Sequence, residues 1–256
     1  MTPVDADGDW GFVESSLGLR LPDDYKDLVR RYGVGSFDDM VLWSPFDTSA
    51  HGGFNLVVQA HGLVDFHYAL RSEYPEDFPY PLYPEPGGLL EWAGSGDGDY
   101  LCWLIEGEAN NWPVIVWNIR KGTDRHDVGA VDLLYGYLSG QRPVQMLRSP
   151  PVAPWFEPYR VRRQVIVNMT EGRLPSAEQH QLLREFLSPT ADRGAWEGYG
   201  DRQDHVKALD RDWLITHNTG RNGHSIWVDC PPEDADQIVG VMRQAAHIMQ
   251  CKVLPH

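Results

Sequence analysis

The sequence predicts an α+β protein built from two folding units, and three observations lead to this prediction. Apolar residues recur at helical spacing in some segments and alternate at strand spacing in others. Turn signals such as Asp97-Gly98 join strand-like segments into antiparallel hairpins. A proline cluster at residues 149–158 separates the two halves. We expect a central, mostly antiparallel sheet flanked by helices, followed by a small β-α-β-β-α two-layer sandwich, with a ferredoxin-like arrangement as one option.

The first domain, residues 1–148, is expected to begin with two helices. Residues 9–17 carry apolar side chains at three- and four-residue spacing. Residues 22–32 start with a proline and two aspartates and end with two arginines, which complements the helix dipole at both ends. Gly33 is a natural C-terminal cap. The buried stripe of the second helix should consist of Tyr25, Leu28, Val29 and Tyr32.

The next segment alternates short elements with glycines. Strands are expected at residues 40–43 and 54–59, and a short helix at residues 65–74. Residues 75–86 are rich in proline and aromatic side chains, so an extended, ordered loop that shelters the sheet is expected there.

Residues 83–103 form the most informative stretch. Pro84 to Gly88 excludes both a helix and a regular strand. A brief apolar segment follows, and Gly94 to Asp99 then forms a tight turn into a strand at residues 100–105. A further strand at residues 113–119 and a helix at residues 127–139 complete the domain. The helix carries Val131, Leu134, Tyr135 and Leu138 at helical spacing.

The second domain, residues 159–256, follows the proline-rich linker at residues 149–158. Strands are expected at residues 163–169, 206–217 and 224–229, the last two joined across Asn222-Gly223. Helices are expected at residues 176–187, where Ser176 and Gln179 match a capping box, and at residues 231–250.

The first domain resembles the SUKH superfamily, the SMI/KNR-like family of cell-wall assembly regulators and bacterial toxin-immunity proteins. The resemblance covers roughly the first 145 residues. It is carried by the motif residues Leu21, Pro22, Tyr25, Gly33, Gly35, Pro86, Gly87, Gly88, Leu89, Trp92, Gly98, Asp99, Trp103, Trp112 and Pro113. Ala93 stands where such sequences usually carry Gly. The resemblance implies a non-enzymatic binding protein. The tryptophans at 92, 103, 112 and 117 should lie in the core.

Charge distinguishes the two halves. Residues 1–150 hold 23 acidic and 10 basic side chains, whereas residues 151–256 hold 14 and 12. Such an acidic domain repels nucleic acid and anionic membranes and attracts a basic protein; simple solubility is the alternative explanation. Candidate partner-binding residues are the loop carboxylates Asp38, Asp39, Glu106 and Glu108. The absence of an apolar span or a signal-like start leads us to expect a cytoplasmic protein.

No motif of known catalytic chemistry is present, and we expect no catalytic residue, cofactor or metal. Asp97 and Asp99 with His61 or His67 could hold an ion, but aspartates in such a turn usually bond their own backbone. His217 and His224 are expected to pair on the surface across a hairpin. The three cysteines show no ligand spacing and should be reduced thiols.

Three functions are compatible with these features. The first is an immunity-type protein that neutralises a basic toxin domain, such as a nuclease, by covering its surface. The second is an intracellular scaffold or regulator of the cell-wall-assembly type. The third is an enzyme whose carboxylate site has no recognisable motif.

Overall fold

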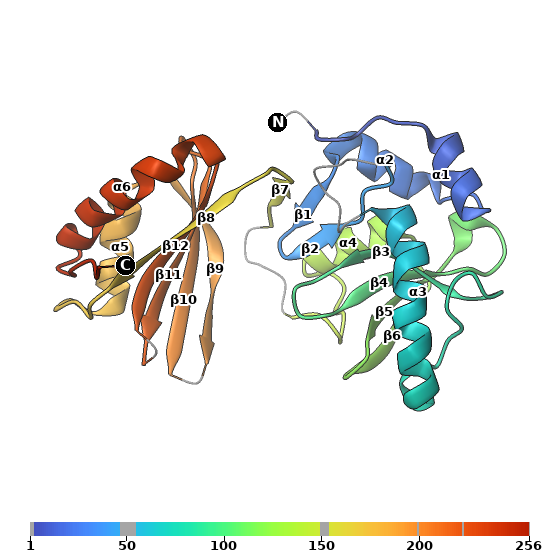
Figure 1. Cartoon of the computed structure of the whole chain (residues 1–256). Coiled ribbons are helices and arrows are strands. Elements are labelled where there is room, and N and C mark those ends of the chain that lie inside the picture. Colours follow the sequence, from blue (N-terminus) through green and yellow to red (C-terminus); the bar gives the residue numbers. More distant parts are fainter. Residues whose placement is uncertain (1–2, 47–54, 149–153, 199, 222, 256) are drawn as a thin grey trace. The chain divides into compact units, whose positions relative to one another are not determined.

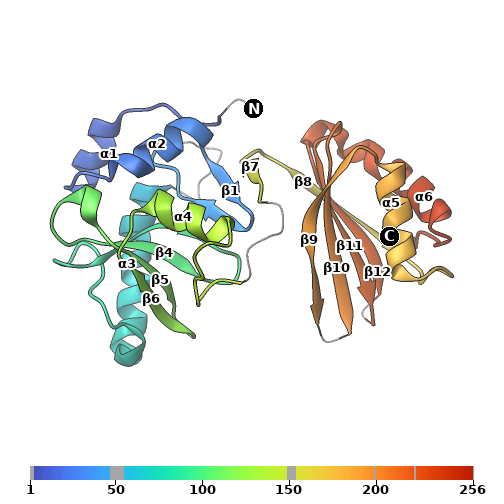
Figure 2. The ribbon, with the colours of Figure 1, turned by 180° about the vertical axis from the view of Figure 1, so that it is seen from behind.

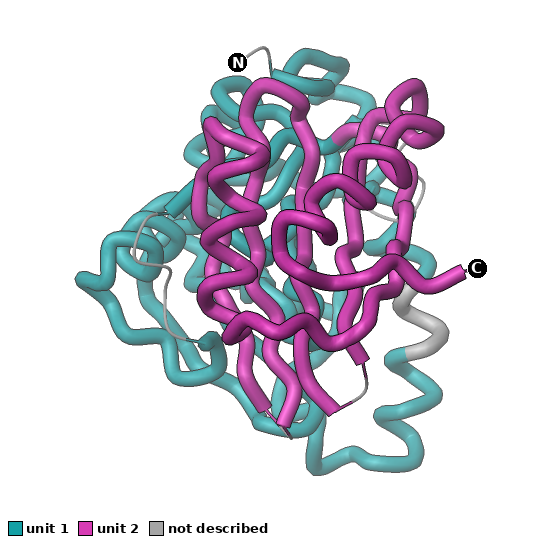
Figure 3. Tube along the Cα trace, turned by 90° about the vertical axis from the view of Figure 1, so that its left-hand side faces the viewer, with its two compact units in different colours: residues 1–159 teal, residues 160–256 magenta. Residues whose placement is uncertain are grey.

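The computed structural model describes residues 3–46, 55–148, 154–198, 200–221 and 223–255. It divides into two compact units, residues 1–159 and residues 160–256 (Figure 3). Each unit combines helices with one antiparallel sheet, which confirms the α+β class.

The first unit contains four helices and a seven-stranded sheet. The helices are α1 (Trp10–Leu17), α2 (Asp23–Tyr32), α3 (Leu56–Glu73) and α4 (Ala130–Leu138). The strands are β1 (Gly35–Phe37), β2 (Met40–Leu42), β3 (Leu89–Gly94), β4 (Tyr100–Leu104), β5 (Val114–Asn118), β6 (Gly122–His126) and β7 (Phe156–Pro158). The strand order is β6-β5-β4-β3-β2-β1-β7, and all neighbours are antiparallel. Helix α3 lies over one face of the sheet and α4 over the other (Figures 1 and 2).

The core of this unit is organised around Tyr25 of α2. Its ring meets Trp103 edge-on at 4.9 Å between centroids, and Trp103 stacks on Trp92 at 5.6 Å. The Tyr25 hydroxyl donates to the carbonyl of Trp43 over 2.7 Å, so the one polar atom of this buried side chain is satisfied. All four tryptophans expected in the core are buried, including Trp112 and Trp117. Apolar burial and ring geometry therefore stabilise the contact between α2 and the sheet.

Two motif glycines are required by close backbone approaches. Gly33 ends α2 at φ +71°, and a Cβ there would lie 2.1 Å from the carbonyl oxygen of Val4. A Cβ on Gly35 would lie 2.4 Å from the carbonyl oxygen of Glu157 in β7. Any larger residue would separate these segments.

The strand expected at residues 54–59 is wrong, because residues from Leu56 onward belong to helix α3. Within the described part of that segment, Asn55 caps the helix by accepting from the amide of Val58 over 2.9 Å. Leu56, Ala60 and His67 of α3 are buried, a spacing that only a helix places on one side. The helix also absorbs the short helix expected at residues 65–74. Packing on the sheet outweighs the strand preference of adjacent valines.

Three strands of the first unit were not predicted from the sequence. β6 is polar because it is an edge strand, and β1 is only three residues long. β7 lies within the expected linker: residues 156–158 pair with β1 and belong to the first sheet. Residues 149–153 of that linker lie outside the described residues.

The other predictions for the first unit were confirmed only in part. The turn at 94–99 and helices α1 and α2 are confirmed. In the loop at 75–86, Phe78 and Tyr83 are buried as expected, whereas Tyr74 is exposed. Tyr135, one of the apolar-spaced residues of α4, is 64% exposed, and the helix buries Tyr137.

The second unit is a two-layer arrangement of one sheet and two helices. Its elements are β8 (Arg163–Met169), α5 (Ser176–Phe186), β9 (Thr190–Gly198), β10 (Asp201–Ala208), β11 (Trp213–Gly220), β12 (His224–Cys230) and α6 (Ala235–Ile248). The sheet order is β8-β12-β11-β10-β9, with antiparallel neighbours throughout. Both helices pack on one face of this sheet, which we call the covered face (Figures 1 and 2). We call the other face the open face.

This unit has two more strands than the β-α-β-β-α prediction. Strands β9 to β12 are neighbours in sequence order, which differs from the β-α-β-β-α-β connectivity of the ferredoxin-like arrangement. The single strand expected at residues 206–217 is in fact parts of β10 and β11, joined by a turn at residues 209–212. β9 carries mostly exposed side chains, so it lacks the apolar alternation that signals a strand. The capping box is also wrong: α5 has Pro175 at its N-cap, and Gln179 donates to the carbonyl of Leu174 instead.

Two further observations concern the described residues. None of their helices has both the length and the apolarity to cross a lipid bilayer. All three cysteines are buried free thiols, as expected.

Candidate partner-binding surface

The antiparallel register of the first sheet places three of its turns at one end, which we call the turn end. These are the turns at residues 38–39, 95–99 and 119–121. The loop at residues 105–113, which joins β4 to β5, lies at the opposite end, which we call the loop end. Strands of five residues separate the two ends by about 17 Å.

The turn end contains Asp38 and Asp39, two of the four candidate partner-binding residues. Both are paired within the chain: Arg148 Nη2 lies 3.0 Å from Asp38 Oδ2 and 3.2 Å from Asp39 Oδ1. The Asp38 side chain is only 5% exposed. Burial raises the pKa of Asp39, against the opposing effect of Arg148. This end is therefore poorly suited to attract a basic partner.

Asp99, also at the turn end, is buried and bonded to neighbouring side chains. Its side chain is 3% exposed and accepts from Asn118 Nδ2 at 2.7 Å, Lys121 Nζ at 3.1 Å and Ser95 Oγ at 3.1 Å. Asp97 is exposed. The alternative of an ion held by these two aspartates required His61 or His67 nearby.

The structure does not bring those histidines to the aspartates. His61 Nε2 lies 3.3 Å from the carbonyl oxygen of Ser16, and His67 Nδ1 lies 3.3 Å from Glu91 Oε1. Burial raises the pKa of Glu91 to about 8 and lowers the pKa of His67 to about 4. The cavity beside this pair measures about 20 Å³, room for about one water molecule, so no substrate fits there.

The loop end contains the other two candidates, Glu106 and Glu108, and both are exposed. Glu106 lies 3.8 Å from Arg125 in a weak ion pair. Asn110 ties this loop to α2 through two hydrogen bonds with Asp23, at 2.8 and 2.9 Å. The bond from Asn110 lowers the pKa of Asp23, whose side chain is 60% exposed. The four candidates thus divide between opposite ends of the sheet, and of these four only Glu106 and Glu108 at the loop end are exposed.

An exposed aromatic side chain, Tyr135, lies on α4, whose first turn contacts the start of α2. Asp24, next to Asp23, accepts from the amide of Val131 over 3.1 Å and so joins the starts of α2 and α4. Tyr135 follows Val131 by four residues, about 6 Å along the helix. The spacing of Tyr135 in α4 resembles that of a core residue, so sequence alone did not indicate it as a surface group.

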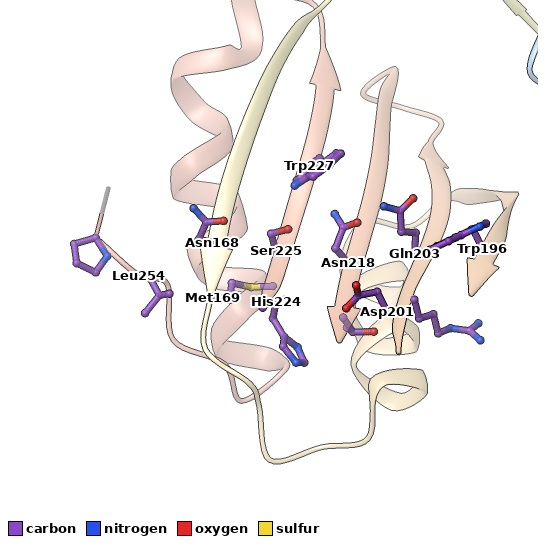
Figure 4. Close-up of a pocket in the computed structure, with 14 residues that line it drawn as sticks. Asn168, Met169, Trp196, Asp201, Gln203, Asn218, His224, Ser225, Trp227 and Leu254 are labelled. Atoms are coloured by element: carbon purple, nitrogen blue, oxygen red, sulfur yellow. The ribbon is translucent and has the colours of Figure 1, made fainter. Parts of the chain in front are cut away.

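The second unit has a separate hollow on its open face, with a volume of about 570 Å³. Five of its lining residues occupy one cross-strand row, with one residue from each strand, as Figure 4 shows. The row runs Trp196, Gln203, Asn218, Ser225 and Asn168. These side chains supply neutral hydrogen-bond donors and acceptors and one aromatic face. The row itself includes no carboxylate, histidine or cysteine.

The expected surface pair of His217 and His224 is wrong. The β11–β12 register places His217 opposite Ile226, and His217 is fully buried on the covered face. Sequence alone could not show this, because the turn position that sets the register decides which face a residue occupies.

Comparison with known proteins places the first unit in a family. Residues 7–130 match the family model SUKH_6, described as SMI1-KNR4 cell-wall. No curated protein and no solved structure matches the chain.

Proposed function

The N-terminal domain belongs to the SUKH superfamily, and on this basis we propose that the protein is a non-enzymatic, immunity-type binding protein. Its target is a basic toxin domain, which it neutralises by covering the toxin surface. The family membership carries this proposal, since the superfamily includes toxin-immunity proteins.

The loop end supplies a physical means of binding. Asp23, Glu106 and Glu108 are exposed there, on a loop and helix start held together by Asn110. These carboxylates are already held on an ordered loop and helix. Binding a basic surface therefore does not require ordering that segment first. Each exposed ion pair contributes little affinity, so the main effect of these charges is on the association rate.

Tyr135 is the proposed aromatic anchor of the interface. It is 64% exposed although it is large and partly apolar, and exposed tyrosines are enriched at the energetic centre of protein interfaces. The four family tryptophans are buried and cannot fill this role. Exposed carboxylates favour fast encounter, and an aromatic anchor favours slow dissociation.

The test is co-expression of the chain with the toxin domain encoded beside it. Replacing Asp23, Glu106 and Glu108 by lysine should lower the association rate about 10-fold or more and flatten its salt dependence. Protection of cells should weaken accordingly. Survival no better with the folded wild-type chain than without it would refute the immunity function.

A matched control reverses the same number of charges elsewhere in the unit. Glu73, Glu76 and Asp97 are exposed acidic residues outside the loop end. Their replacement by lysine changes the net charge equally and should leave association much closer to wild type. Equal effects of the two triple variants would contradict the loop end as the interface.

A second candidate function is an intracellular scaffold or regulator, favoured by the cell-wall description of the matching family. Such a protein would bind a constitutive cellular partner. A toxin-encoding gene directly upstream would favour immunity, whereas its absence, with a stable partner from the cell-wall machinery, would favour the regulator.

A further inference from the structure

Three metal-ligand side chains converge on the covered face of the second unit. His180 comes from α5, Asp204 from β10 and His217 from β11. One donor atom from each lies within 4.8 Å of the other two. These residues are 24 and 13 positions apart in the chain, so no sequence motif reveals the group. The cluster lies outside residues 7–130, which match the family.

His217 provides the strongest indication of a ligand. Its side chain is fully buried, and neither of its ring nitrogens has a hydrogen-bond partner among the described residues. Nδ1 of His180 is likewise buried without a partner in the described part of the chain. Buried polar atoms are normally satisfied, and each unsatisfied one destabilises the fold. A ligand that accepts the electron pair of one nitrogen of each ring would remove part of this cost.

The chemical form of the residues suits a metal ion. A buried imidazole such as that of His217 is neutral at pH 7 and retains one lone pair for coordination. Asp204 accepts two hydrogen bonds from the Arg202 guanidinium, which stabilise its carboxylate form. Two neutral imidazoles and one carboxylate are a donor set used for zinc and other first-row transition metals.

Coordination of one ion requires only modest movements of these side chains. The rings of His180 and His217 are nearly parallel, at 6°, with centroids 5.9 Å apart. Ligands about 2.0–2.1 Å from a tetrahedral zinc ion are roughly 3.3 Å from one another. Donors now within 4.8 Å must therefore approach by up to about 1.5 Å, which side-chain rotation of His180 and Asp204 can supply.

Arg202 supplies the outer contact that metal-binding carboxylates usually have. Its Nε donates to Asp204 Oδ2 over 2.8 Å and its Nη2 to Oδ1 over 2.5 Å. Each carboxylate oxygen accepts more than one bond, so one lone pair remains for an ion. Such outer contacts orient ligands and strengthen metal binding.

The cluster also has an access route. A hollow of about 460 Å³ on α5 is lined by His180, Arg184, Ser188 and Thr190, among others. His180 is partly exposed and connects this hollow with the buried His217. The solvent side of the cluster is therefore at His180.

We propose that His180, Asp204 and His217 bind one divalent transition-metal ion of the zinc class, which ties α5 to the covered face of the sheet. The three ligands come from a helix and two strands, so the ion cross-links the two layers of this unit. Binding to the folded state alone raises its stability.

The test uses the full chain, freed of metal by a chelator and dialysed, and titrated with Zn²⁺. We expect one ion per chain with a Kd of about 1 µM or tighter, and an increase in Tm. Co²⁺ should give the visible absorption of a low-symmetry, nitrogen-coordinated site. His180→Gln and His217→Gln should each weaken binding more than about 100-fold, beyond the effect of losing an outer contact.

Two controls make the result decisive. His247→Gln, at an exposed position of α6, should bind zinc like wild type. His217→Leu, of similar volume, should raise the Tm of the metal-free protein and abolish the zinc-induced shift, because it removes two unsatisfied nitrogens. If His217→Gln does not fold, His180→Gln decides. Failure of the folded wild type to bind Zn²⁺ below about 100 µM, or wild-type binding by the folded His180 and His217 variants, would overturn the proposal.

Discussion

The buried pair of Glu91 and His67 makes stability depend on pH in a specific window. Their contact distance of 3.3 Å favours an ion pair, but their side chains are only 11% and 4% exposed. Burial of two charges costs more than this single contact returns. The pKa of Glu91 accordingly rises to about 8 and that of His67 falls to about 4, so both side chains are neutral at pH 7.

The sign and size of the effect follow from the unfolded pKa values of 4.5 and 6.5. Between pH 6.5 and 8 the folded state keeps a proton on Glu91 that the unfolded state has lost. Stability therefore falls by about 1.4 kcal/mol per pH unit, or about 2 kcal/mol across the window. Between pH 4.5 and 6.5, the unfolded state instead binds a proton on His67, and the two contributions cancel.

Glu91→Gln isolates this contribution, because it keeps the shape and removes the titration. The variant should gain about 2 kcal/mol over wild type between pH 6.5 and 8. Below pH 6.5 the effect of His67 should appear alone, as a stability that declines with falling pH. Urea unfolding followed by tryptophan fluorescence measures both curves, with exposed Glu106→Gln as the control. Parallel pH profiles of wild type and Glu91→Gln would refute the reasoning.

Two further predictions concern the fold. Residues 1–159 and 160–256, expressed separately, should each unfold cooperatively in calorimetry, since each has its own core; aggregation or non-cooperative unfolding of either piece would show that it depends on the other. Asp99→Asn should lower the free energy of unfolding by about 2–3 kcal/mol, because an amide donor would replace an acceptor that faces Asn118 and Lys121. The exposed neighbour Asp97→Asn should change it by less than about 0.5 kcal/mol in the same urea titration.

Local patterns were sufficient for the elements whose signals are local. Helix α2 begins after Pro22 and ends at Gly33 because these residues restrict the backbone itself. The hairpin around Asp97-Gly98 follows from the backbone preferences of its turn residues. The family motif in that stretch could be recognised from sequence because it also depends on local residues. The difference in net charge between the two halves also follows from the sequence alone.

Tertiary packing decided the elements whose local signals were weak or misleading. Residues 55–59 are helical because Leu56 and Ala60 are buried in the same core, although adjacent valines favour a strand. β6 and β9 exist because each pairs with a neighbouring strand, not because of apolar alternation.

The sites depended on tertiary structure even more strongly. Sequence identified Glu106 and Glu108 as exposed loop acids, but only the register of the sheet separates them from Asp38 and Asp39. The same holds for His180, Asp204 and His217, which are far apart in the chain and meet where α5 crosses two strands. Composition and turn chemistry act over a few residues, whereas a site forms where distant segments meet, and their contacts are set by the packed fold.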